Sequence, residues 1–151
     1  MTIEGVFSAC NTLALVGWIL LLAFPRHRLA TLIAGAAIPL TLSVVYLTVF
    51  ALHARGSNGG FSTLAAVAEL FGNRWLLLAG WVHYLAFDLF IGAWETRDAM
   101  SRGMHRLLLA PCLILTFMLG PIGLLCYHGL RAFVHQPLDG AVLPPVARAD
   151  R

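Results

Sequence analysis

The sequence contains no lysine and few charged residues of any kind. Only 11% of its 151 residues are charged, whereas soluble domains are about a quarter charged, and 60% are hydrophobic. The formal net charge of +3 is small, and its positive contribution comes from scattered arginines, which argues against binding to nucleic acid. A lipid bilayer is the solvent that suits this composition.

Cysteine and metal-binding motifs are also scarce. Cys10, Cys112 and Cys126 lie in apolar stretches without CxxC spacing, so we expect packing residues rather than ligands or a disulfide framework. No apolar run contains HxxxH or HxxE, and we predict neither a metal nor another cofactor. Glu4 precedes the first apolar run without a basic residue, which argues against a signal peptide. An Arg- and Ser-rich transit segment is missing too, which favours a bacterial inner membrane protein.

Four apolar runs are long enough to cross a bilayer, which takes about 20 residues. They cover residues 6–24, 29–52, 75–94 and 107–130. Only helices and closed barrels satisfy the backbone in lipid, and runs this continuous favour helices. We therefore predict an all-α integral membrane bundle of four transmembrane helices over residues 1–131, followed by a disordered tail over 132–151.

The segment between the second and third runs is too short and too polar to span. "FSTLAAVAELFG", residues 61–72, predicts a short amphipathic or re-entrant helix capped by Ser62 or Thr63. Arginines near the runs predict the orientation. Those after the first and third runs are Arg26, Arg28, Arg97, Arg102 and Arg106, against Arg55, Arg74 and Arg131 on the other side. The positive-inside rule then places the first group in the cytoplasm and both termini outside.

Two ionisable residues, His83 and Asp88, interrupt the third run. At 100° and 1.5 Å per residue they lie about 140° apart around the helix and about 7.5 Å apart along it, so they do not share a face. Asp88 shares its face with Tyr84, Ile91, Gly92 and Glu95, and His83 shares its face with Phe87 and Phe90. Because lipid penalises each charge by about 2.5–3.5 kcal/mol, both residues are candidates for function. The alternative is that each hydrogen-bonds to a neighbouring helix.

Polar and aromatic residues on the other runs complete the candidate site. We predict that the substrate-binding residues are Asn11, Trp18, Tyr46, Trp81, Tyr84, Phe87, Asp98, His105 and Pro121. Six of the nine also have a structural interpretation: interhelical bonding for Asn11, an aromatic belt for Trp18 and Trp81, a solvated interface for Asp98, a helix cap for His105, and packing for Pro121. Glu95, Arg97 and Arg102 are assigned to the same solvated interface as Asp98. Pro39 and Pro121 free the carbonyls of Gly35 and Phe117, which can bond to side chains or face a ligand cavity.

Several stretches match one family in order and spacing. They are "NTLALVGWILLLAFP" at 11–25, "HYLAFDLF" at 83–90, Asp98, His105 and "GPIGLL" at 120–125. The chain thus resembles the abscisic-acid-deficient-four-like family of small four-span membrane proteins. Plant members of that family are required to make neoxanthin from violaxanthin in the chloroplast. His83 and Asp88 match the family's histidine and aspartate, but Ala93 stands where many members have an arginine.

The resemblance implies isomerisation of a xanthophyll without a redox cofactor. A 5,6-epoxide opens and the polyene loses a proton, which leaves an allene and a hydroxyl group. This chemistry needs an acid near the epoxide oxygen and a base near the departing proton, and a neutral Asp88 suits the acid and His83 the base.

The sequence alone leaves two other functions open. In the first, the protein binds a carotenoid or another lipid, or assists an enzyme, without catalysing a reaction itself. In the second, it is a metal-dependent membrane enzyme whose ligands come from His83, Asp88, Asp98 and His105. The expected partners are a hydrophobic polyene or isoprenoid ligand and membrane lipid, and a homodimer is possible.

Overall fold

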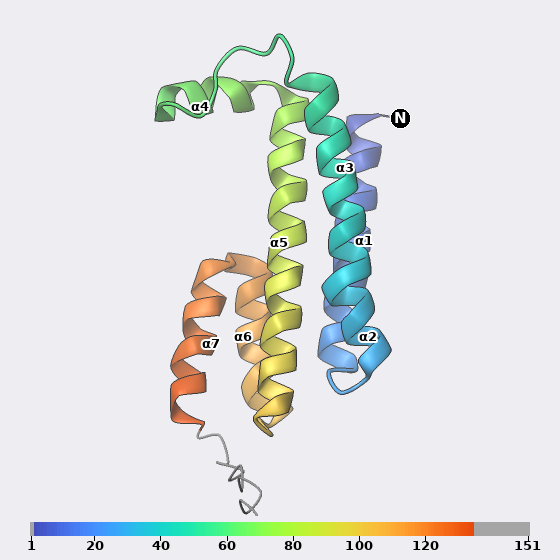
Figure 1. Cartoon of the computed structure of the whole chain (residues 1–151), viewed down its shortest axis with the longest axis vertical. Helices are drawn as coiled ribbons and strands as arrows, with labels where there is room; N and C mark the ends of the chain where they lie inside the picture. Colours follow the sequence, from blue (N-terminus) through green and yellow to red (C-terminus); the bar gives the residue numbers. More distant parts are fainter. Residues whose placement is uncertain (1, 135–151) are drawn as a thin grey trace, which may run out of the picture.

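The structure, a computed structural model, describes residues 2–134 and is entirely helical in that range. Three helical rods run the full length of the molecule (Figure 1). They are α1 (Ile3–Ala23), the continuous helix formed by α2 (Arg28–Leu32), η1 (Ile33–Ala37) and α3 (Ile38–His53), and α5 (Arg74–Ser101). Each rod is long and apolar enough to cross a membrane. Three of the four predicted spans are therefore confirmed as long apolar helices.

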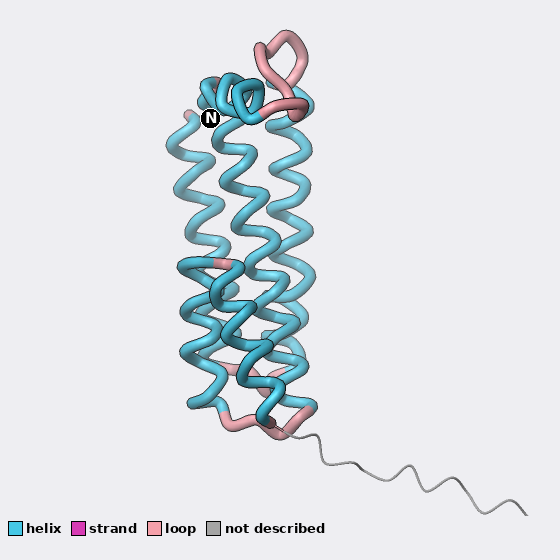
Figure 2. The backbone as a smooth tube through the Cα atoms, turned by 90° about the vertical axis from the view of Figure 1, so that its left-hand side faces the viewer, coloured by secondary structure: helices cyan, strands magenta, loops and turns pink. Residues whose placement is uncertain are grey.

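The fourth predicted span is wrong, because residues 107–130 fold into a hairpin. Helix α6 (Arg106–Leu119) ends at Gly120, and α7 (Pro121–Phe133) runs back beside it. Figure 2 shows the turn at about half the height of the long rods. Helices of 14 and 13 residues are about 21 and 20 Å long, whereas the hydrocarbon core is about 30 Å thick. The chain therefore enters and leaves this layer at one end.

Gly120 makes this reversal possible. Its φ of +47° lies in a region that residues with a Cβ atom rarely adopt. Pro121, the first residue of α7, lacks a backbone N–H that could continue α6. Gly123 packs directly on the backbone of Thr116, so the two arms touch without an intervening side chain.

The hairpin also corrects the predicted orientation. The N-terminus lies at the upper end of the molecule in Figure 1, whereas α7 ends at the lower end. With three long helices and one half-depth hairpin, Thr2 and Val134 lie at opposite ends instead of on one side. The predicted tail, residues 132–151, lies outside the described residues from 135 onward.

Helix caps explain several element boundaries. Thr63 begins α4 (Leu64–Gly72) by accepting a bond from the Ala66 N–H at 3.1 Å, as one of the two predicted caps. Asn73 begins α5 in the same way through the Trp75 N–H at 2.9 Å. Helix α4 lies across the upper end of the rods, nearly perpendicular to α5 (Figures 1 and 2). The short amphipathic helix of the sequence prediction is therefore present.

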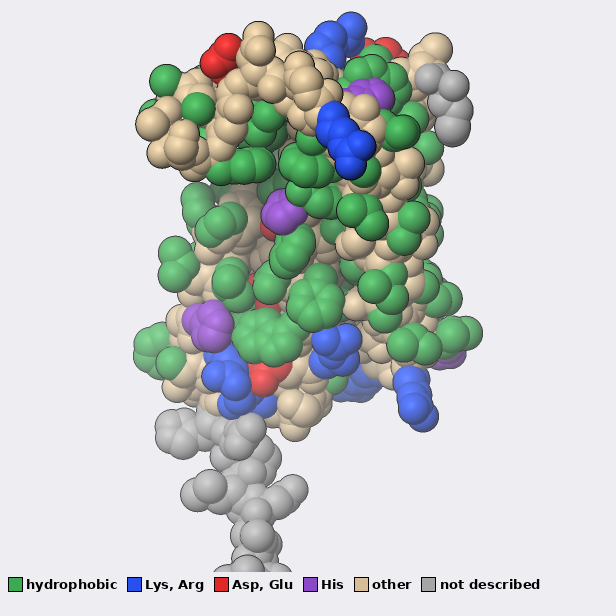
Figure 3. Space-filling model, turned by 45° about the horizontal axis from the view of Figure 1, so that its top comes forward, with side chains coloured by type: hydrophobic (Ala, Val, Ile, Leu, Met, Phe, Trp, Pro, Cys, Tyr) green, Lys and Arg blue, Asp and Glu red, His purple; other side chains and the backbone are tan. Residues whose placement is uncertain are grey.

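The π-helical turn η1 precedes Pro39, which has no N–H and whose ring crowds the carbonyl of Gly35. At this turn Gly35 approaches Ala93 so closely that a side chain at Gly35 would collide with the Ala93 methyl group. Helix α5 packs against every other helix and forms the centre of the bundle. On the face shown in Figure 3, charged side chains gather toward the two ends, and hydrophobic side chains cover much of the middle.

Candidate intramembrane carboxyl site

One face of α5 meets the α6–α7 hairpin along a polar seam. Tyr84, Asp88, Glu95 and Asp98 all contact the hairpin. The sequence already placed Tyr84, Asp88 and Glu95 on one helical face, and the structure confirms that they turn to the same neighbour. We define this set of four residues as the carboxyl seam. It begins at the hairpin turn and ends at the lower end of α5.

Asp88 lies at the hairpin turn. A Cβ atom on Gly120 would be 3.1 and 3.2 Å from its two carboxyl oxygens, so the bare glycine leaves room for the carboxyl group. Asp88 Oδ2 is buried and has no hydrogen-bond partner among the described residues. A carboxyl oxygen in this state favours the neutral acid, because an ionised group needs donors or counter-charges in apolar surroundings. The predicted role of Asp88 as a proton donor is compatible with this geometry.

Tyr84 joins the carboxyl seam to the space above it. Its hydroxyl group donates to the carbonyl of Phe117 at 3.2 Å. That carbonyl is the one freed by Pro121, so the prediction that a side chain can satisfy it is confirmed. The Tyr84 ring also packs against Trp81, with ring centroids 5.4 Å apart.

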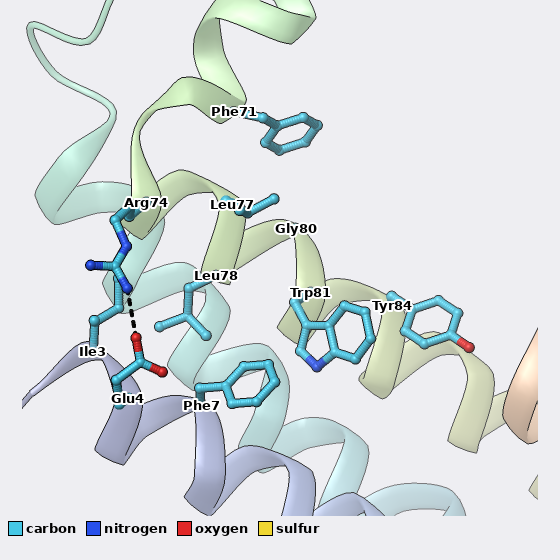
Figure 4. A pocket seen from close by; sticks show the side chains of 10 residues that line it. All are labelled: Ile3, Glu4, Phe7, Phe71, Arg74, Leu77, Leu78, Gly80, Trp81 and Tyr84. Carbon is cyan, nitrogen blue, oxygen red and sulfur yellow. Dashed lines mark hydrogen bonds and ion pairs between the residues drawn. The ribbon is translucent and has the colours of Figure 1, made fainter.

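An apolar groove of about 440 Å³ opens above Tyr84 between α1 and α5, with α4 on its upper side. Figure 4 shows the Phe7, Trp81 and Tyr84 rings along it, with Phe71 of α4 across from them. Its far end carries the Arg74–Glu4 ion pair. The groove follows α5 from Arg74 to Tyr84, about 15 Å.

Asn11 borders the same region and supports Trp81. Its side-chain oxygen accepts a bond from the Trp81 indole N–H at 3.2 Å, while its amide nitrogen donates to the Phe7 carbonyl at 2.7 Å. Both polar ends of the amide are therefore engaged within the protein, and Trp81 is held with its ring toward the groove. The bond between Asn11 of α1 and Trp81 of α5 is the interhelical hydrogen bond that the structural interpretation of Asn11 predicted.

Glu95 was missed as a site residue, because the sequence interpretation assigned it to a solvated interface. It is instead 0% exposed, and the Thr116 hydroxyl lies 3.0 Å from each of its carboxyl oxygens. The signal was present in the sequence, since Glu95 lies seven residues, or two helical turns, after Asp88. Its nearness to the end of the span concealed it.

Asp98 is also not at a solvated interface. It accepts bonds from Arg102 at 2.8 Å, from Arg131 at 2.8 and 3.2 Å, and from the Tyr127 hydroxyl at 2.7 Å. This cluster ties the end of α7 to the end of α5. Its two carboxyl oxygens accept from four donor atoms of the protein, so Asp98 holds helices together in this structure. Its predicted contact with substrate stays a prediction.

His83 faces a different part of the molecule. Its ring stacks on Phe87 at 4.6 Å and packs on Tyr46 at 5.6 Å, and it lines a second groove of about 240 Å³. That groove shares only Phe71 and Gly80 with the first one. The structure therefore brings together His83, Tyr46 and Phe87, but it does not bring His83 to the groove beside Tyr84.

The other predicted residues lie apart from that groove. Trp18 is buried, packs on Phe117 with centroids 5.5 Å apart, and approaches Gly92 where no side chain would fit. Pro121 starts α7 at the hairpin turn. His105 caps α6 by accepting from the Leu107 N–H at 3.3 Å, as its structural interpretation states.

The metal-dependent alternative needs ligands that converge. Within residues 2–134, no three His, Cys, Asp or Glu side chains are placed to hold a metal ion. His83, Asp88, Asp98 and His105 instead have the separate surroundings given above. The ligand set named for that alternative is therefore not assembled.

The fold and the site define a class of protein: a helical membrane protein with a half-depth hairpin that covers the buried Glu95 and the partly buried Asp88 beside an apolar groove. The family model "ABA DEFICIENT 4-like" matches residues 5–127, and the chain belongs to this family. Comparisons with curated proteins and with solved structures gave no match. Membership supports a membrane protein with a carotenoid-related role. It does not support the bacterial inner membrane, since the family is associated with plants and chloroplasts.

Proposed function

We propose that the protein is an intramembrane isomerase that acts on a carotenoid, of the neoxanthin-forming type, or on a related isoprenoid lipid. The observation that carries the proposal is Asp88, whose buried, unpartnered Oδ2 lies at the hairpin turn one helical turn beyond the aromatic groove. A structural aspartate in lipid needs partners, as Asp98 has, and Asp88 lacks them.

The groove suits one long apolar ligand. Its walls are almost entirely hydrophobic side chains, and the Trp81 and Tyr84 rings offer flat surfaces to a conjugated chain. The groove is about 15 Å long, which is shorter than an extended C40 carotenoid, so it suits one half of the ligand with the polar end group near the Tyr84 hydroxyl. In this arrangement an end ring near Tyr84 approaches the carboxyl group of Asp88.

The reaction moves protons and changes no oxidation state. Neutral Asp88 donates a proton to the epoxide oxygen as the carbon–oxygen bond opens, and the polyene loses a proton to form the allene. The acid and the base need to reach the same bound substrate, because the epoxide oxygen and the carbon that loses a proton are close together in it. His83 lines the other groove, so its role as the base stays a prediction.

The experiment is conversion of a xanthophyll epoxide by the purified full-length protein in lipid nanodiscs. The variants are Asp88→Asn and, as a matched carboxyl-to-amide control at an exposed position on α4, Glu69→Gln. We expect Asp88→Asn to lower the conversion rate by about 100-fold or more, since a positioned acid contributes about 10²–10⁴. Full conversion by folded Asp88→Asn protein would overturn the assignment. His83→Gln in the same assay tests the base separately.

The competing function is that of a carotenoid-binding or accessory protein, which the groove alone also supports. The same preparation distinguishes the two. A pigment that stays bound and unchanged in the wild-type protein and in Asp88→Asn alike favours binding without catalysis.

A further inference from the structure

Glu95 is the second buried carboxyl group on the face of α5 that carries Asp88. It is fully buried, and its only hydrogen-bond partner among residues 2–134 is the Thr116 hydroxyl, which lies 3.0 Å from both carboxyl oxygens. None of the salt bridges formed by described residues includes Glu95. The nearest cluster of arginines is engaged with Asp98.

Counting hydrogens determines the protonation state that this geometry suits. A threonine hydroxyl has one hydrogen, so an ionised Glu95 shares that single hydrogen between its two oxygens. A neutral Glu95 has a hydrogen of its own. It then donates to the threonine oxygen, while the threonine hydroxyl donates to the other carboxyl oxygen. The neutral form thus places one hydrogen on each of the two 3.0 Å contacts and leaves no uncompensated charge in the buried site.

The hairpin brings Glu95 near Asp88. Their positions on α5 are about 10 Å apart along the helix, but their contacts on the hairpin, Thr116 and Gly120, are only four residues apart. The Gly120 N–H also donates to the Thr116 carbonyl at 2.9 Å. Thr116 and Gly120, the hairpin residues that the two carboxyl groups face, are therefore separated by about one helical turn.

We infer that Glu95 holds a proton in the folded protein and passes it to Asp88 along the carboxyl seam. This inference rests on the proposed function for its second part only. After Asp88 gives its proton to the substrate, Glu95 returns one to Asp88 and is itself protonated again from the lower, aqueous end. The proton released from the polyene goes to water, so the cycle consumes none. Glu95 is thus a positioning residue that acts through Asp88.

The first test measures the proton directly. Infrared spectra of the full-length protein in nanodiscs, recorded in H₂O and D₂O, should show the carbonyl stretch of neutral carboxylic acids, to which Asp88 also contributes, and Glu95→Gln should remove the component that belongs to Glu95. Glu69→Gln on the exposed face of α4 is the matched control and should leave the band intact. A band of unchanged intensity in Glu95→Gln overturns the inference, whatever the protein's activity.

The second test measures the relay. None of the other titratable or charged groups along the interface of α5, α6 and α7 is changed in the Glu95→Gln variant: these include Tyr84, Asp88, Asp98, Arg102, Cys112, Tyr127 and Arg131. We expect Glu95→Gln to lower conversion of the xanthophyll epoxide by about tenfold and to change its dependence on pH. Conversion at the wild-type rate with an unchanged pH profile overturns the relay.

A pair of threonine variants separates this role from a packing role. Thr116→Ser keeps the hydroxyl group and should retain the infrared band and the conversion rate. Thr116→Val keeps the shape and removes the donor, so it should shift the band and slow conversion. Equal behaviour of the two variants overturns the inference. If the wild-type protein converts no carotenoid, the proposed function fails, while the infrared band still tests the proton on Glu95.

Discussion

The upper and lower halves of the molecule pack in different ways. In the lower half, the hairpin fills the space beside α5 and buries Glu95 and Thr116 completely. In the upper half no such layer is present, and the space between α1, α5 and α4 is an open groove lined by Phe7 and Trp81. The half-depth hairpin therefore creates a covered polar seam and an open apolar groove within one membrane layer. Asp88 lies where they meet.

The two halves also use charges differently. Asp98 below is 16% exposed in its side chain and has three donor residues, whereas Glu4 above is 70% exposed and has one. We expect Asp98→Asn to lower the free energy of unfolding by about 2 kcal/mol, because it leaves partly buried arginines unpaired. Glu4→Gln should cost less than about 0.5 kcal/mol. Thermal unfolding in detergent measures both, and equal effects would contradict the contrast between the halves.

The hairpin turn itself is the next target. Gly120→Ala places a methyl group at φ +47° and about 3 Å from the Asp88 carboxyl group. We expect a loss of about 1–2 kcal/mol of stability together with slower conversion. Gly72→Ala at the end of α4 meets no atom within 4 Å and is the matched control, with little change in either quantity. A fully stable and active Gly120→Ala protein would show that the turn does not have this conformation.

A change in the upper groove should have the smallest effect on stability and the clearest effect on ligand retention. Trp81→Leu removes a ring surface and the bond to Asn11, and we expect bound carotenoid to be held several-fold less tightly. Leu77→Ala, in the same groove but without an aromatic ring, should weaken retention less. Absorption spectra after dilution of the loaded protein compare them. Unchanged retention in Trp81→Leu places the ligand elsewhere.

The sequence predicted the long helices because their apolar runs match the bilayer thickness. The same criterion misled at residues 107–130, since a largely apolar run of 24 residues satisfies it whether the chain continues straight or turns back. Only Gly120 followed by Pro121 marked the turn, and this pair is also common in helices that continue. The positive φ of Gly120 produces the turn, and a hydropathy profile contains no information on backbone conformation.

The candidate site followed the same pattern. Helical spacing placed Tyr84, Asp88 and Glu95 on one face and separated His83 from them, as the structure shows. It did not show which neighbour covers that face, because this depends on the hairpin. Glu95 and Asp98 were therefore assigned to the interface by their distance from the centre of the span, although the hairpin buries the first and pairs the second.

The turn at Gly120 has a consequence for sidedness. Because α7 returns to the lower end, Arg131 joins Arg26, Arg28, Arg97, Arg102 and Arg106 there, and Arg55 and Arg74 stay at the upper end. The sequence predicted five of these eight arginines on one side of the membrane and three on the other, whereas the structure places six at the lower end and two at the upper end. The positive-inside rule then predicts that the lower end faces the cytoplasm or the compartment equivalent to it. The apolar groove then opens to the leaflet opposite the arginines, and under the proposed function we expect the ligand to enter from that leaflet.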